Sequence, residues 1–177
     1  MFPPAGRPIS YFETHLGGEA AIVRTMPNAP AAVGRGITAV CANIHVTAGQ
    51  RVACEHLLEA VGEVVWVDDE ALIDPVTAVS GSGPAYVFLL IECLAQAGEA
   101  QGLPPEIAAK LARATVAGSG ELARQSDETA ATLRQNVTSP GGTTAAALDV
   151  LMADDGLQPL MNRAIEAATR RSRELAG

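Results

Sequence analysis

The stretch from Tyr86 to Leu94 carries apolar residues on every face that a helix would present. A helix that is hydrophobic all round is normally buried on all sides. A chain of 177 residues has few other elements with which to surround such a helix. We therefore expect the helical half of the protein to need a partner, and a dimer formed by interlocking helices would supply one.

The composition supports packing through small aliphatic residues. Hydrophobic residues make up 48% of the chain but aromatic residues only 3%, and Ala, the best helix former, suits such a core. The formal net charge is -8. This acidic balance argues against a nucleic-acid partner, which would require a basic surface, and against an anionic membrane surface.

No metal site is indicated by the cysteines and histidines. The cysteines stand far apart with no Cys-x-x-Cys spacing, and the histidines show no ligand spacing; they are Cys41, Cys54, Cys93, His15, His45 and His56. Sparse cysteines are typical of reduced thiols in the cytosol. A reactive or metal-binding cysteine is the alternative interpretation.

Targeting signals are not evident in the sequence. The start, Met1 to Pro4, lacks a basic segment followed by an apolar one. The most apolar stretch, Ala85 to Ile91, ends at Glu92 and is too short for a bilayer span. We expect a cytoplasmic protein with no membrane segment.

Two regions differ in the spacing of their hydrophobic residues. Up to residue 68, short β-like runs alternate with one helix: strands at Ala20–Val23, Ile37–Cys41 and Val64–Val67, and a helix at Thr47–Val61. Strands separated by helices predict an α/β layer, although these strands are too few for a complete one.

Residues 69–177 are predicted to be helical almost throughout. Asp74 followed by Pro75 is a typical helix start, as is Pro84 after Gly83, and Gly102 ends a helix. Further helices are predicted from Pro104 to Leu122, Thr129 to Gln135, Thr143 to Met152 and Leu157 to Leu175. The predicted domains are therefore 1–68 and 69–177.

The best candidate site is Val137 to Thr144, Val-Thr-Ser-Pro-Gly-Gly-Thr-Thr, directly before a predicted helix. Two glycines let the backbone turn tightly and expose N–H groups, and a helix start adds unpaired N–H groups and a positive dipole end. The loop therefore suits a small anion such as a carboxylate or phosphate. The alternative is a plain loop with an N-capping threonine.

Three further segments are weaker candidates for a site. Ser80 to Pro84 precedes a helix and suits phosphate, but it lacks both the P-loop and the Gly-x-Gly-x-x-Gly pattern, so a bend between helices is the alternative. Met26 to Pro30 follows a strand, where ligands of α/β folds collect, and an ordinary proline-rich loop is the alternative. Asp127 and Glu128 suit either a general acid or a solvated turn.

Several of these segments together resemble the pyrroline-5-carboxylate reductase family. Asn136 to Leu151 looks like the family signature, and Asp74 to Tyr86 is similar to its linker into a helical domain. Val23 to Thr38 resembles the last part of its cofactor domain, and Ala5 to Ile9 also matches. The resemblance implies an α/β remnant of a Rossmann domain followed by an all-α helical dimerisation domain.

The resemblance implies hydride transfer from NADPH or NADH to 1-pyrroline-5-carboxylate, giving L-proline. Ser139 and the amides of Gly141 and Gly142 would bind the substrate carboxylate, and Thr144 would serve the ring nitrogen as hydrogen-bond partner or proton donor. Val137 and Thr143 complete the implied substrate-binding set. Met26, Pro27 and Asn28 would face the nicotinamide. A homodimer, often assembled further, is implied as well.

The chain departs from the family pattern in three places. Ala29 stands where threonine is usual and Pro75 where alanine is usual. The strand, glycine-rich turn and helix that bind the cofactor pyrophosphate are not found, and Met1 matches the middle of the Rossmann domain. We therefore expect weak or absent NADPH binding by this chain alone. A non-catalytic oligomerisation or proline-binding module is the alternative, and a start codon placed too late is another.

Overall fold

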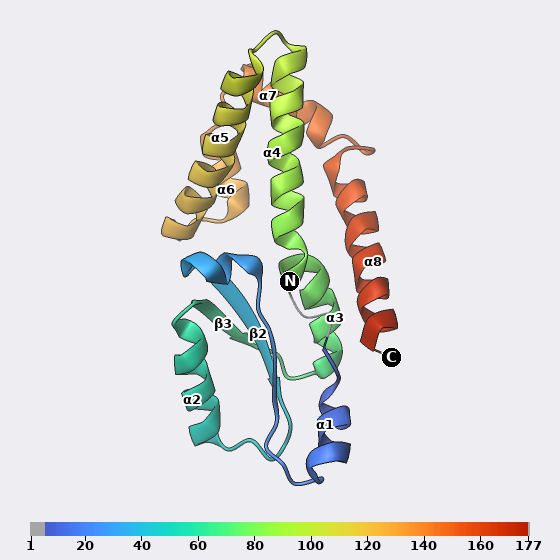
Figure 1. Ribbon diagram of the computed structural model, residues 1–177. Coiled ribbons are helices and arrows are strands. Elements are labelled where there is room, and N and C mark those ends of the chain that lie inside the picture. The colour runs from blue at the N-terminus through green and yellow to red at the C-terminus, as the bar shows by residue number, and fades with distance from the viewer. Residues whose placement is uncertain (1–5, 177) are drawn as a thin grey trace. The chain divides into compact units, whose positions relative to one another are not determined.

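The computed structural model describes residues 6–176 (Figure 1). Met1 to Ala5 and Gly177 lie outside the described residues. The predictions made for the start of the chain, and Ala5 of the family resemblance, fall on these residues. Contacts divide the chain into an α/β unit, residues 1–84 with 163–177, and a helical unit, residues 85–162. The predicted boundary at residue 68 stays a prediction. Each unit is described by itself.

A three-stranded sheet forms the centre of the α/β unit. Its strands lie in the order β1 (Val23–Met26), β2 (Gly36–Ala42) and β3 (Gly62–Trp66). The first two are antiparallel, with Val23 opposite Ala42, and the last two are parallel. The α/β layer is confirmed.

The first strand begins later than predicted. Its expected range, Ala20–Val23, was wrong because ladder pairing begins only at Val23, while Ile22 bonds to Asn43 just past the end of β2. The Ile22 N–H donates to Asn43 Oδ1 at 3.1 Å, and ladder pairing starts only at Val23.

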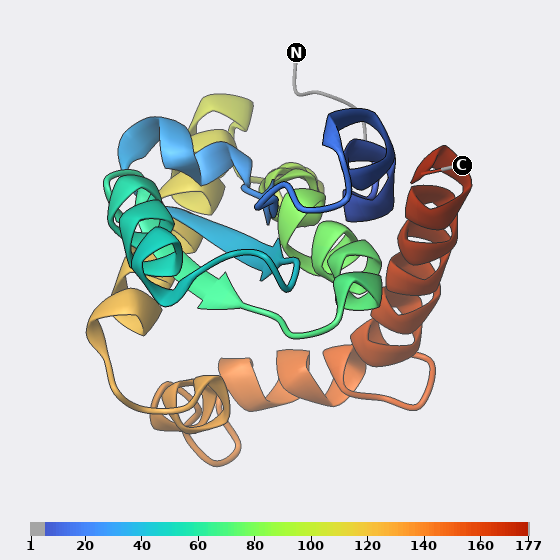
Figure 2. The same cartoon turned by 90° about the horizontal axis from the view of Figure 1, so that it is seen from below.

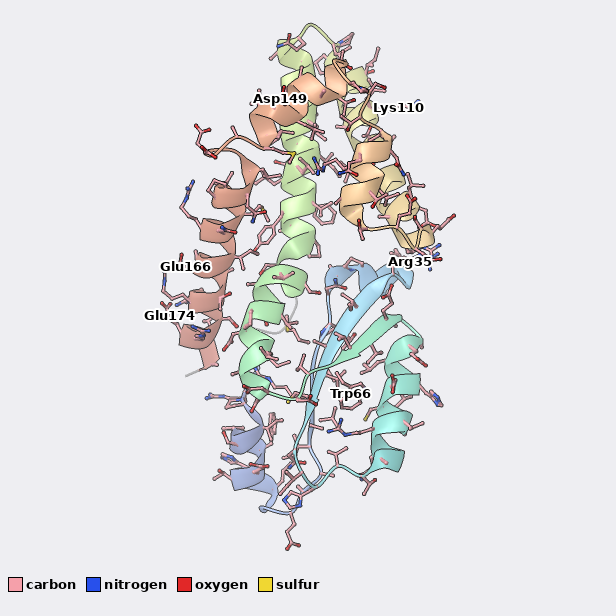
Figure 3. The ribbon with its side chains drawn as sticks, turned by 180° about the vertical axis from the view of Figure 1, so that it is seen from behind. Arg35, Trp66, Lys110, Asp149, Glu166 and Glu174 are labelled. Carbon is pink, nitrogen blue, oxygen red and sulfur yellow. The ribbon has the colours of Figure 1, made fainter. Side chains whose placement is uncertain are left out.

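Helix α2 (Ala48–Glu59) crosses from β2 to β3 and covers one face of the sheet (Figures 1 and 2). Thr47 and Gln50 form a capping box at its start, which explains why the helix was predictable. Arg51 on α2 lies over the Trp66 ring, 4.7 Å from its centroid, and Trp66 is labelled in Figure 3. This cation–π contact fixes α2 against β3.

The other face of the sheet carries α1 (Ile9–Leu16) and α3 (Ile73–Val76) (Figure 2). Side chains alternate along β2, so Ala39 and Cys41 face these helices and pack with Ile9, Ile22 and Ile73 in one buried cluster. Helix α1 was not predicted. Its only fully buried residue is Ile9, which leaves little periodic signal in the sequence.

An ion pair fastens α1 and β1 to the segment just before α3. Arg24 Nη1 lies 2.7 Å from Glu70 Oε1, and the side chains are 14% and 29% exposed. The same carboxylate oxygen accepts the Ile9 N–H at 2.8 Å. The partly buried carboxylate is thus paired and hydrogen-bonded, which burial of a charge requires.

A long helical segment begins with a 3₁₀ turn, η2 (Glu70–Leu72), and runs through α3 and a π-helical turn, η3 (Thr77–Gly81), into α4 (Gly83–Ala100). Asp69 caps its start by accepting the Ala71 N–H at 2.8 Å. The predicted cap, Asp74, was wrong: it lies inside the helical segment.

Asp74 has a distant partner instead. Its carboxylate accepts a hydrogen bond from Ser172 Oγ at 2.6 Å, and Ser172 is 3% exposed. This bond ties the end of α8 (Leu157–Ala176) to α3 within the α/β unit.

The helical unit contains most of α4, α5 (Pro105–Gln125), α6 (Ala130–Asn136), α7 (Thr143–Leu151) and the start of α8 (Figure 1). The predicted helices of this region are confirmed within one or two residues, except α5, which runs three residues further. Among its described residues, Ala108 and Ala112 alone are buried hydrophobics. The all-apolar part of α4 is exposed in the single chain, and Phe88 is 59% exposed.

The helical segment Glu70–Ala100 is long and apolar enough, by length and composition alone, to cross a membrane. This segment is much longer than the apolar stretch 85–91 that stands out in the sequence. Buried core helices pass the same criterion, so the finding is weak evidence for a membrane span. Only 6% of its most apolar 18-residue window is buried within the chain.

Candidate functional site

The loop predicted to bind an anion lies between α6 and α7 and is shaped by hydrogen bonds within itself. Thr138 uses its hydroxyl to donate to Arg134 O at 2.6 Å and its N–H to donate to Gln135 O at 2.9 Å. Both bonds satisfy carbonyl groups at the end of α6. The loop therefore leaves α6 in a fixed direction.

The two glycines of the loop have different roles. Gly141 has φ +69°, a left-handed conformation that costs other residues about 1–2 kcal/mol. A Cβ on Gly142 would lie 3.1 Å from Ser139 O, so the backbone passes close to itself there. Glycine at both positions lets residues 139–142 form a tight turn.

The start of α7 offers unpaired backbone donors. Gly142 is the N-cap residue and makes no side-chain cap, so the alternative of an N-capping threonine is not observed. Thr143 and Thr144 occupy the first helical turn, where N–H groups have no partner inside the helix. The positive end of the helix dipole adds to the preference for an anion.

One predicted donor is already used. The Gly142 N–H donates to Ser139 O at 3.0 Å and closes the turn, so its amide is not free in this conformation. Within the described part of the chain, the hydroxyl groups of Ser139 and Thr144 have no hydrogen-bond partner. The loop thus presents two hydroxyl donors beside the first N–H groups of α7.

A pocket of about 350 Å³ lies behind this loop, between α6 and α7. Its lining includes Arg134, Thr138, Leu148 and Asp149, the last of which is labelled on α7 in Figure 3. The Arg134 guanidinium donates to Met152 Sδ at 2.8 Å. This contact joins α6 to the residue that follows the C-terminal end of α7.

The second predicted binding loop, Met26 to Asn28, begins at the last residue of β1 in the α/β unit. The Asn28 carboxamide is occupied: its Oδ1 accepts the Ile37 N–H at 3.0 Å, and its Nδ2 donates to Ser80 Oγ at 3.2 Å. Pro27 has no N–H to offer. The exposed surface of the loop therefore has few donors and suits a flat ring better than a phosphate.

This chain thus contains only part of the binding site expected for the cofactor that the resemblance implies. The Met26–Asn28 loop remains the predicted contact for the nicotinamide end. The 177 residues contain no Gly-x-Gly-x-x-Gly, so the pyrophosphate has no such cradle here. A hollow of about 230 Å³ beside β1, lined in part by Arg24, Met26 and Thr77, is too small for a dinucleotide.

The weaker candidates have structural explanations. Residues 80–84 form the π-helical turn and the first turn of α4 rather than a phosphate loop. Glu128 accepts a hydrogen bond from Asn136 Nδ2 at 2.9 Å in an exposed turn. Burial raises the pKa of the Cys41 thiol, and nearby Glu70 raises it further, so this cysteine is not an activated nucleophile.

Residues capable of holding a metal do not gather anywhere in residues 6–176. Sequence analysis missed Thr138 and Ser80 as residues that shape the two loops. Thr138 was within reach of prediction, because a threonine just after a helix often bonds back to the fourth residue before it. Ser80 was not, because it meets Asn28 across 52 residues.

Comparison with known proteins matches residues 70–175 to the family described as pyrroline-5-carboxylate reductase dimerisation. A pyrroline-5-carboxylate reductase of Pseudomonas aeruginosa is 46% identical over 172 residues, which cover 97% of this chain and 63% of that protein. One of Synechocystis is 50% identical over 155 residues, covering 88% of this chain and 57% of that protein. The chain spans about three fifths of the length of these relatives.

Solved structures agree. A pyrroline-5-carboxylate reductase of Coxiella burnetii superposes with a TM-score of 0.92 at 42% identity, over 97% of this chain and 63% of that one. A Plasmodium falciparum pyrroline carboxylate reductase with NADP bound gives a TM-score of 0.82 at 34% identity, over 97% and 64%. Because the family match covers more than half of its residues, this chain belongs to the pyrroline-5-carboxylate reductase dimerisation family.

Proposed function

We propose that this chain is the substrate-binding and dimerisation part of a pyrroline-5-carboxylate reductase. The reaction adds a hydride from NADPH or NADH to the imine carbon of 1-pyrroline-5-carboxylate and a proton to its nitrogen, giving L-proline. The observation that carries the proposal is the turn at Ser139–Gly142, which sets free hydroxyl and N–H donors at the start of α7.

The carboxylate of the substrate is assigned to Ser139 Oγ, Gly141 N–H and the Thr143 N–H. Gly142 contributes mainly by allowing the tight turn, because its N–H is already bonded to Ser139 O. The loop itself has no charged side chain, so neutral donors and the helix dipole would neutralise the carboxylate. Val137, 63% exposed before the turn, is assigned to contact with the ring.

Thr144 is assigned to the ring nitrogen. Its hydroxyl has no partner among the described residues, so it is available to donate a hydrogen bond or relay the proton. NADPH or NADH supplies the hydride when bound. Met26, Pro27 and Asn28 are assigned to contact with the nicotinamide, and they hold this place through their own hydrogen bonds and packing.

Calorimetry with L-proline tests the assigned loop in this chain. We expect binding that Ser139→Ala weakens about tenfold or more, the effect of losing a hydrogen bond to a charged group. Thr115→Ala, an exposed threonine on α5, serves as the control and should leave binding unchanged. Absence of proline binding by the folded chain, or equal binding by the Ser139→Ala variant, would remove the loop from the site.

Activity needs the longer protein. In a hybrid where this chain replaces the matching 63% of the Pseudomonas aeruginosa relative, Thr144→Ala should lower kcat about 100-fold or more, as loss of a proton-transfer group does. Proline affinity should fall much less. Unchanged turnover would exclude Thr144 from the chemistry.

Assembly and location complete the proposal. A second copy of the chain would cover the exposed apolar face of α4, as the family's description as a dimerisation domain suggests. The enzyme would then be a cytoplasmic homodimer or a larger assembly of dimers.

A second candidate function rests on that same exposed face. The chain would then be a helical oligomerisation or proline-binding module without catalysis. Proline-dependent thermal stabilisation, with no reductase activity in the hybrid, would favour this alternative.

A further inference from the structure

Two segments that sequence analysis treated separately meet in the α/β unit. The Met26–Asn28 loop follows β1, and the π-helical turn Thr77–Gly81 lies about 50 residues later. Asn28 Nδ2 donates to Ser80 Oγ at 3.2 Å. A Cβ on Gly81 would lie 2.5 Å from Met26 Cε, so the Met26 side chain passes directly over this glycine.

The orientation of the Asn28 carboxamide is determined by its partners. The Ile37 N–H can only donate, so the oxygen of the carboxamide must face it, at 3.0 Å. The nitrogen therefore faces Ser80, whose hydroxyl oxygen accepts. Ser80 thus fixes the second end of a side chain whose first end is bound to β2.

The π-helical turn explains how Ser80 reaches the loop. Pro84 has no N–H, so it cannot donate to the Ser80 carbonyl as an α-helical residue would. The wider turn accommodates this gap, and Ser82 N–H donates to Thr77 O at 2.8 Å. Such single π turns occur frequently at functional sites. Here the turn directs Ser80 and Gly81 toward the end of β1.

We propose that Ser80 is a positioning residue for hydride transfer. It acts through Asn28, holding the Met26–Asn28 loop in the conformation that faces the nicotinamide, while Gly81 leaves the space that Met26 occupies. This inference rests on the proposed function, which assigns that loop to the nicotinamide. Neither Ser80 nor Gly81 touches the reacting atoms in this assignment.

The first test uses this chain itself and needs no cofactor. Ser80→Ala should shift the NMR signals of the Asn28 side-chain amide and the Ile37 backbone amide. Ser82→Ala is the matched control, because it lies in the same turn and its side chain makes neither contact. Unchanged Asn28 signals in the Ser80→Ala variant would overturn the link on which the inference depends.

The second test measures hydride transfer in the folded, dimeric hybrid with the Pseudomonas aeruginosa relative. Ser80→Ala should lower kcat about tenfold, since small displacements of a reacting group are costly, with the KM for the imine within about twofold. The kinetic isotope effect with deuterated NADPH should increase, because hydride transfer becomes more rate-limiting. Ser80→Thr, which keeps the hydroxyl, should recover much of the lost turnover.

The outcomes separate the two proposals. A purely structural role for Ser80 predicts a lower active fraction with the isotope effect unchanged, which would overturn the positioning role. Parent-like kinetics in the Ser80→Ala variant would also overturn it. A folded parent hybrid that does not reduce the imine would instead overturn the proposed function, and the positioning role with it.

Discussion

The two units of the chain bury their side chains to very different degrees. In the α/β unit, Val40 and Ala78 are fully buried and Thr38, Ala39 and Ile73 nearly so. In the described part of the helical unit, buried hydrophobic residues are limited to two alanines, while five large apolar residues of α4 are at least 43% exposed. One unit carries its own core, whereas the other leaves large apolar side chains exposed. This contrast suggests where the chain depends on a partner.

The largest effect is expected from a charge on the exposed face of α4. Phe88→Asp should weaken dimerisation at least about 100-fold, because burial of one such side chain contributes about 1.5–3 kcal/mol and a two-fold interface loses it twice. Light scattering coupled to size exclusion would measure it. Leu57→Asp, on the 75% exposed side chain of α2, should leave the dimer intact.

Two results would contradict the inference that a second copy covers the exposed face of α4. A parent chain that elutes as a clean monomer would show that α4 needs no second copy. A parent that partitions into lipid vesicles would show that lipid covers the Glu70–Ala100 segment instead.

The core of the α/β unit gives the next largest effect. Val40→Ala should lower the free energy of unfolding by about 2 kcal/mol through lost burial and a cavity, without changing the dimer dissociation constant. Urea unfolding followed by the fluorescence of Trp66 would report it. Val52→Ala, at a half-exposed site on α2, should cost far less. A large change in dimerisation would contradict a self-contained core.

The bond between Ser172 and Asp74 tests where the α/β unit ends. Ser172→Ala should cost about 1.5 kcal/mol, because it leaves a partly buried carboxylate without its short hydrogen bond. Hydrogen exchange should accelerate in α3 and the end of α8. If exchange accelerates instead in α5 and α6, the C-terminal segment belongs with the helical unit.

The smallest effect concerns the Cys41 thiol, whose pKa is raised by burial and by Glu70. The folded state favours the neutral thiol, so its contribution to stability is complete below the unfolded pKa of about 8.5 and is lost as the pH rises through the folded pKa. The parent should therefore lose stability relative to Cys41→Ala as the pH rises above about 8.5. Identical pH profiles in urea unfolding would contradict this.

Local signals explain what the sequence could predict. The Thr47–Gln50 capping box, the helix stop before Gly102 and the Pro104–Pro105 helix start all depend on neighbouring residues, and each is found in the structure. Asp74 was misassigned because its partner, Ser172, lies 98 residues away. Helix α1 escaped prediction because a distant side chain, Glu70, binds its first N–H.

The candidate site shows the same limit. The glycine turn and the helix start after it were predicted from adjacent residues, and the structure has both. Which N–H groups remain available depends on a bond inside the turn, from Gly142 to Ser139, that a sequence pattern does not specify. The role of the loop in substrate binding stays a prediction.

The glycines that open the two parallel strands have a consequence for engineering. Gly36 lies opposite Gly62, and any side chain on Gly62, whose φ is +150°, would collide with the Gly36 carbonyl. The alignment of these strands is therefore set by a point where two backbones touch. A designer grafting this chain onto a different cofactor-binding segment could rewrite the outer surface of α2 freely, but would have to keep both glycines.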